Sequence, residues 1–152
     1  IMTAPGVPPG EIEERVALRV GRRPVIEPPL PAEFRAFVGQ GAFYQAIGGR
    51  SVMAAQVRHL IEAARRPNVD LRVVPYGAGW HPGLEGAFTV LTSGRSAPVV
   101  FLENRKTVLC LHRTADVREY QRAADTLLDA AMSREHSLMF LADTVTKMET
   151  PR

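Results

Sequence analysis

The residues best placed to contact a ligand or a partner lie in one glycine-rich segment, residues 75–84. It holds the single tryptophan, Trp80, directly before His81, among three glycines and two prolines. Glycine lets a backbone approach a ligand closely, and loops carry functional residues more often than cores do. The candidate contact residues here are Tyr76, Trp80, His81 and Gly83. The alternative is a tight connection between strands, in which Trp80 covers the core and His81 bonds to the backbone.

The other reactive side chains do not form a known catalytic or cofactor pattern. No Lys-Ser or Lys-Thr pair follows the glycines, so the segment is not a phosphate loop. The four histidines have no metal-ligand spacing, and no serine lies in a Gly-x-Ser-x-Gly elbow. Cys110 has apolar neighbours and is expected to be a buried, inert thiol. We therefore expect neither an enzyme nor a cofactor or metal site.

Glu103 is the remaining candidate for a binding site. It ends an apolar run just before the turn at Asn104. A paired-carboxylate site would need a partner such as Glu85, at a distance that the sequence does not give. The alternative is a solvated charge at a turn.

Length and composition predict one domain over residues 1–152 that needs no metal or disulfide to hold its core. No apolar run reaches the length of a membrane span, and no signal peptide is evident, so we expect a cytoplasmic protein without membrane contact. The first residue, Ile1, precedes a methionine, which predicts a fragment of a longer polypeptide.

The charge of the chain is only slightly basic. Lysine and arginine number 19 against 16 acidic residues, a net charge of +3. The arginines are scattered, so direct DNA binding is not expected.

The elements that must position these residues follow from hydrophobic periodicity. A helix is predicted from Pro9 to about Val20, and a second helix begins after a cap at Ser51 and stops before Pro67. Segment 33–44 is ambiguous between strand and short helix. Short strands are predicted over 69–75, 86–92, 97–103 and 107–112, and helices over 117–131 and from Ser133 onward. The fold class is therefore α+β: a mainly antiparallel sheet of about four to five strands flanked by helices.

The last helix carries an apolar stripe that allows two interpretations. Its members repeat at spacings of three and four: Leu138, Leu141, Val145 and Met148. Such spacing is coiled-coil-like and predicts a homodimer. Alternatively, the stripe packs on the sheet of the same chain.

Two stretches of the chain resemble a known family. They are 67–76, Pro-Asn-Val-Asp-Leu-Arg-Val-Val-Pro-Tyr, and 79–91, whose most specific part is His81-Pro82-Gly83-Leu84 followed by Gly86, Phe88 and Thr89. Segments 11–16, 53–67 and 99–103 fit the same pattern. The chain resembles a C-terminal domain of unknown function that occurs in XRE-type helix-turn-helix regulators of actinobacteria.

The resemblance implies a role in transcriptional control, with DNA contacted only through an N-terminal helix-turn-helix domain outside this chain. It names no ligand. Because such regulators often lie beside genes for small proteins, a small partner protein and a small-molecule effector are both expected partners. A dimerisation module without ligand and a small-metabolite enzyme are the alternatives.

Overall fold

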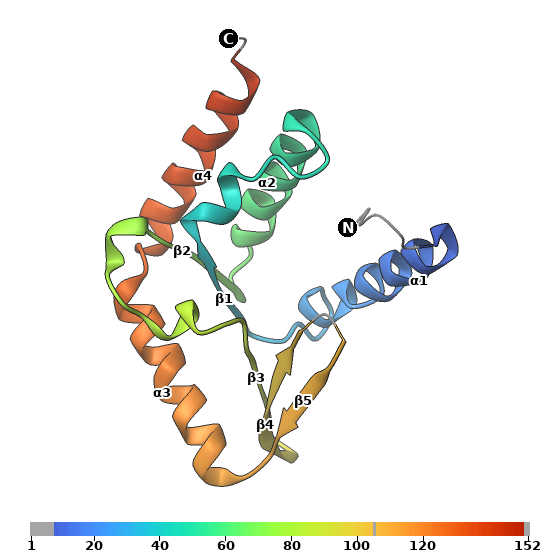
Figure 1. Cartoon of the computed structure of the whole chain (residues 1–152), viewed down its shortest axis with the longest axis vertical. Coiled ribbons are helices and arrows are strands. Elements are labelled where there is room, and N and C mark those ends of the chain that lie inside the picture. Colours follow the sequence, from blue (N-terminus) through green and yellow to red (C-terminus); the bar gives the residue numbers. More distant parts are fainter. Residues whose placement is uncertain (1–7, 105, 151–152) are drawn as a thin grey trace.

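The computed structural model describes residues 8–104 and 106–150, which form an α+β fold (Figure 1). Short 3₁₀ turns join the main elements. In chain order these are α1 (Pro9–Val20), β1 (Phe34–Gly39), α2 (Arg50–Ala64), β2 (Val69–Val74), β3 (Thr89–Ser93), β4 (Ser96–Glu103), β5 (Val108–Leu111), α3 (Thr114–Ala130) and α4 (Arg134–Glu149). No helix in these residues is long and apolar enough to cross a membrane.

The strands form two small sheets, so the prediction of one mainly antiparallel sheet was wrong in this respect. β1 and β2 pair in parallel, whereas β3, β4 and β5 form a separate antiparallel sheet in that order. The reason lies in the connections. α2 returns the chain so that β2 runs in the same direction as β1, whereas short turns join β3, β4 and β5. The ambiguous segment 33–44 contains both structures, strand β1 and then a 3₁₀ turn (Gln40–Tyr44).

The helix boundaries agree closely with the sequence at most ends. α1 ends at Val20 with Gly21 following, and the Ser133 side chain caps α4 by accepting a hydrogen bond from the His136 backbone N–H at 3.1 Å. The predicted cap at Ser51 was wrong, because α2 already begins at Arg50 after Gly49. Gly49 has a φ of 95°, which residues other than glycine rarely adopt. This backbone turn sets the start of α2.

The main core lies where α2 and α4 cover β1 and β2 (Figure 1). Its members include Phe43, Val57, Val73, Leu141 and Val145, and Leu141 is fully buried. Three of the four residues of the apolar stripe, Leu138, Leu141 and Val145, therefore pack within the chain, as the second of its two interpretations predicts.

Arginines join α2 and α4 at both ends of this antiparallel pair. The Arg50 guanidinium, at the start of α2, donates to the carbonyls of Lys147 (2.8 Å) and Met148 (3.0 Å) near the end of α4. At the opposite end, Arg134 donates to the carbonyl of Ala64 and, at 2.9 Å, to that of Arg66. The carbonyls of Ala64, Lys147 and Met148 lie in the last turns of their helices, where carbonyls have no partner within the helix, so the two arginines satisfy groups that would otherwise need water.

The free edge of β2 is covered by the junction between α3 and α4. The Val73 backbone N–H donates to the hydroxyl of Ser137 at 3.0 Å, and its carbonyl accepts from the Met132 N–H at 2.9 Å. Ser137 is fully buried. Side-chain and loop groups thus take the place of a third strand.

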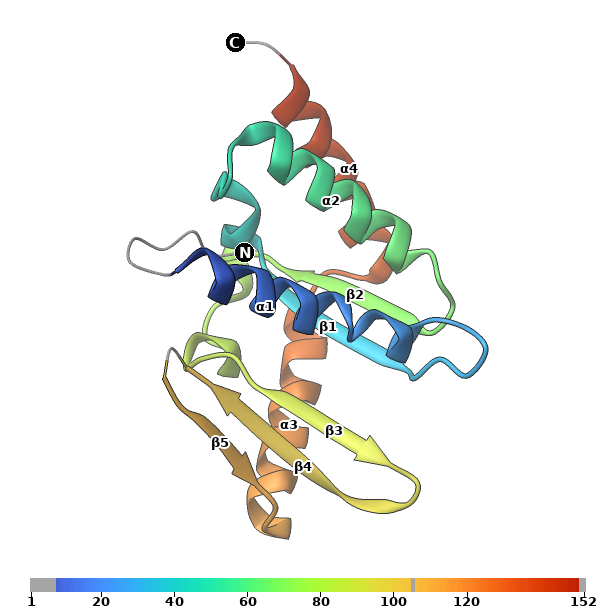
Figure 2. The same ribbon diagram turned by 90° about the vertical axis from the view of Figure 1, so that its right-hand side faces the viewer.

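α3 connects the two sheets. It crosses one face of the three-stranded sheet, as Figure 2 shows, and also reaches β2. Val117 and Leu127 are its buried residues, and Val100 is fully buried on β4. The side of α3 that carries Glu119, Tyr120 and Arg122 borders the candidate site together with the β4–β5 hairpin.

Candidate functional site

A groove of about 760 Å³ lies where three segments of the chain meet. Its walls come from the segment 80–88, from the end of the β4–β5 hairpin, and from one side of α3. We call it the α3 groove. A volume in this range is typical of sites for small molecules.

Apolar and aromatic side chains supply much of its lining. Leu102 and Leu109, which pair across β4 and β5, contribute from the sheet. Phe88 and Tyr120 also line the groove, with ring centroids 5.1 Å apart and ring planes tilted by 59°. Such tilted pairs are favourable because the positive edge of one ring faces the negative face of the other.

The polar lining carries more negative than positive charge. In the part of the chain that the structure describes, Glu85, Glu103 and Glu119 line the groove together with one cationic residue, Arg122. Among residues 8–104 and 106–150, none of these four forms an ion pair. Their charges therefore remain available to a bound molecule.

The hairpin that positions Glu103 is held by its own turn. The Asn104 side-chain oxygen accepts the backbone N–H of Lys106 at 3.0 Å and of Thr107 at 2.9 Å. A side chain that bonds to the backbone two and three residues on fixes a turn. Glu103, at the end of β4, is therefore presented from a defined backbone.

Two of the five residues predicted as contacts, Trp80 and Glu103, line this groove. Trp80 is 69% exposed. The alternative in which it covers the core is therefore wrong, because a tryptophan sealing a core would be buried. The structure brings Trp80, which precedes β3, into the same groove as Glu103, the last residue of β4.

Tyr76 lies apart from the α3 groove and packs elsewhere. Its ring stacks on that of Tyr44 with centroids 6.0 Å apart, and its backbone N–H donates to the Gln40 side chain at 3.0 Å. Tyr76 is 71% exposed. It therefore belongs to a second surface, next to the 3₁₀ turn that follows β1.

Neither His81 nor Gly83 lines the groove, and Gly83 packs against Leu127 of α3. A methyl group added at Gly83 would lie 3.1 Å from His81 Nδ1 and 3.3 Å from Leu127 Cδ2. His81 Nδ1 is buried and has no hydrogen-bond partner among the described residues. Gly83 thus permits a close approach between this loop and α3, and the two residues position the segment that carries Trp80.

Cys110 is exposed, and the prediction of a buried thiol was wrong. β5 is an edge strand of the three-stranded sheet, so apolar sequence neighbours do not bury it. The described residues hold no group of three histidine, cysteine or acidic side chains that could bind a metal ion.

Comparison with protein families adds one finding. The model of a domain of unknown function, DUF5753, matches residues 1–143. The chain belongs to this family. No curated protein and no solved structure matches this DUF5753 domain.

Sequence reasoning missed the contribution of α3 to the groove of this DUF5753 domain. Glu119, Arg122, Ala123 and Thr126 line it at spacings of three and four, which places them on one side of the helix. They lie outside the core stripe of this helix, so the sequence pattern alone predicts a solvent-exposed face there. A signal did exist in Tyr120, whose aromatic ring borders that face.

Proposed function

We propose that this chain is the effector-sensing domain of a helix-turn-helix transcription regulator, and that the α3 groove binds the effector. The observation that carries the proposal is the groove itself, with about 760 Å³ of space, aromatic and aliphatic walls and a few polar groups. Small-molecule sites have this size and composition. The resemblance of segments 67–76 and 79–91 to XRE-type regulators supplies the link to DNA.

The position of α3 supports a sensing role. This helix lines the groove and also contacts β2, β3 and β4. A molecule that binds differently to two positions of α3 would shift the balance between them. That shift would reach both sheets through one rigid helix.

A substitution that fills the groove tests this proposal. Thr126 is exposed and lines the groove, whereas Asp125 is its exposed neighbour outside it. Thr126→Phe is made in the intact regulator, with Asp125→Phe as the matched control. Thermal-shift screening of wild-type protein against a metabolite library identifies binders, and gel shifts with operator DNA then measure their effect.

We expect binders to change operator affinity in the wild type and in Asp125→Phe, and to lose that effect in Thr126→Phe while its melting temperature stays the same. If Thr126→Phe responds like the wild type, effector sensing does not use the α3 groove. If binders leave DNA affinity unchanged in all three proteins, the sensing role itself is rejected.

Binding of a small partner protein is the second candidate, because the same loop exposes large apolar side chains. Leu84 is 65% exposed and lies outside the groove lining, close to Trp80 in sequence. Exposed apolar anchors of this kind are typical of protein contacts. Leu84→Ser should weaken capture of a partner protein in pull-downs and leave small-molecule binding intact.

A further inference from the structure

The aromatic residues of the α3 groove form a surface suited to a positive charge. Trp80, Phe88 and Tyr120 line it, and Trp80 leaves 69% of its surface in solvent. The faces of aromatic rings carry partial negative charge and attract cations, and tryptophan does so best. An exposed tryptophan at a groove that also holds a ring pair is a strong platform for such a contact.

The ionisable groups of the groove favour the same sign of ligand. Among the lining residues that the structure describes, the three carboxylates of Glu85, Glu103 and Glu119 outnumber the one guanidinium, that of Arg122. In the described part of the chain none of the three is neutralised by an ion pair. A half-enclosed site lined mainly by one sign of charge raises the local concentration of ions of the opposite sign.

The spread of these carboxylates argues against a metal ion as the cation. They come from the segment before β3, the end of β4 and the middle of α3. Among the described residues they do not converge into a metal-binding group. Carboxylates that are spread around an apolar lining favour a larger organic molecule with a positively charged group over a single metal ion.

We propose that the α3 groove binds an organic cation, a molecule that combines a quaternary or protonated amine with an apolar or aromatic part. The apolar part covers Leu102 and Leu109, and the charged nitrogen lies toward Trp80 and the carboxylates. The proposal rests on the α3 groove being the effector site, and it names the chemical class of that effector.

The single tryptophan of the chain makes binding directly measurable. Benzyltrimethylammonium is the probe, titrated into the intact protein while the fluorescence of Trp80 is followed. Benzyl alcohol and phenylacetate serve as the neutral and anionic counterparts with the same ring. We expect saturable quenching by the cation, with the two counterparts binding at least about tenfold more weakly.

Charge variants sharpen the test, because they predict effects of opposite sign. Glu103→Gln and Glu119→Gln should each weaken binding of the probe by about threefold. Arg122→Gln should strengthen it by a similar factor. Asp125→Asn, on the same helix but outside the groove, should leave it unchanged. Each variant is compared at equal folded fraction, checked by circular dichroism.

The outcomes separate this proposal from the broader one. Tighter binding of benzyl alcohol or phenylacetate, or no saturable binding of the cation, overturns the organic-cation inference while leaving the groove as an effector site. Equal effects of Arg122→Gln and Glu119→Gln overturn it as well. Cation binding with the expected charge dependence supports it, even if operator affinity does not respond and the regulatory role fails.

Discussion

The buried hydroxyl of Ser137 satisfies a backbone group that no strand reaches. It accepts the Val73 N–H at 3.0 Å, and the residue is fully buried. Ser137→Ala leaves that N–H without a partner, which costs about 1–3 kcal/mol of unfolding free energy. Urea denaturation should show the lower midpoint. Ser51→Ala, at an exposed position of α2, serves as control, and equal midpoints for the two variants would contradict the assignment.

Trp80 has the opposite character, since it contributes surface rather than core. Because its side chain is 69% exposed, Trp80→Ala should change the unfolding free energy by less than about 0.5 kcal/mol. Phe88→Ala, in the same groove, should cost at least about 1 kcal/mol through loss of its contact with Tyr120. Thermal and chemical denaturation measure both. A large decrease in the unfolding free energy of Trp80→Ala would indicate that this residue has a structural role.

At the scale of elements, arginine contacts at both ends add to the core packing that joins α2 and α4. Arg134 is half-buried and bonds to the carbonyl of Ala64, the last residue of α2, and to that of Arg66 just after it. Arg134→Met should lower the unfolding free energy by about 1.5–3 kcal/mol, because hydrogen bonds to charged groups lie in this range. Arg50→Met, at an exposed position, should cost less.

Chemical denaturation with Arg118→Met as the reference checks this ranking. Arg118 is exposed on α3 and forms no ion pair among the described residues. If Arg134→Met behaves like Arg118→Met, the contacts at the α2–α4 junction contribute nothing to stability.

The elements also show how far sequence reasoning reaches. Helices α1, α3 and α4 were predicted within a few residues, because apolar spacing and caps such as Ser133 are local signals. The division into two sheets was not predicted, because the pairing of Phe34 with Val69 joins segments that are far apart in the sequence. The site followed the same rule. Trp80 and Glu103 were identified by type and position, whereas Glu119 and Arg122 acquire their role only when α3 lies beside the hairpin.

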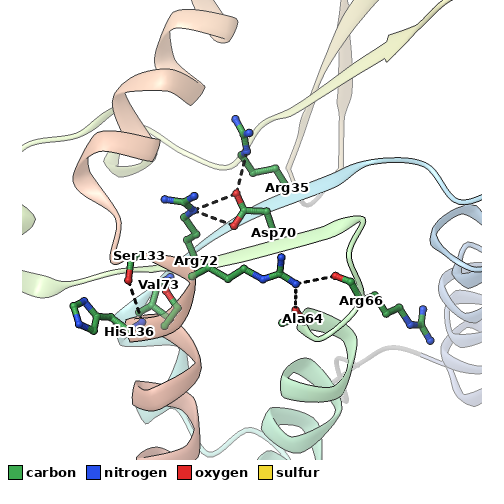
Figure 3. A network of polar contacts seen from close by, with 10 residues as sticks. Arg35, Ala64, Arg66, Asp70, Arg72, Val73, Ser133 and His136 are labelled. Atoms are coloured by element: carbon green, nitrogen blue, oxygen red, sulfur yellow. Dashed lines mark hydrogen bonds and ion pairs between the residues drawn. The ribbon is translucent and has the colours of Figure 1, made fainter.

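For the whole molecule, the charges predict poor binding to nucleic acid. The net charge is +3, and several arginines are paired with acids: Arg35 and Arg72 with Asp70 (Figure 3), and Arg66 with Glu27. Phosphate contacts require clustered, free cations. Gel shifts should therefore show only weak, salt-sensitive binding by this chain alone. Tight binding that depends on base sequence would contradict the expectation.

Homodimer formation stays a prediction, and the burial of the α4 stripe changes how it must be tested. Leu141 is fully buried against the core that contains Val57 and Val73. Leu141→Asp would place a charge in that core and should unfold the chain rather than dissociate it. Circular dichroism with analytical ultracentrifugation distinguishes the two. If the variant stays folded and its mass in solution is lower than that of the wild type, the stripe forms a dimer interface.

The covered edge of β2 has a consequence for the synthesis of this protein on the ribosome. Val73 and Ser137 are separated by 64 residues. At about 5–20 residues per second, translation delivers the shielding residue roughly 3–13 seconds after the strand. Through that interval the nascent chain carries Val69–Val74, rich in valine and leucine, with an edge open to other chains. The edge of β2 at Val73 can therefore be closed only after Ser137, at the start of α4, has been synthesised.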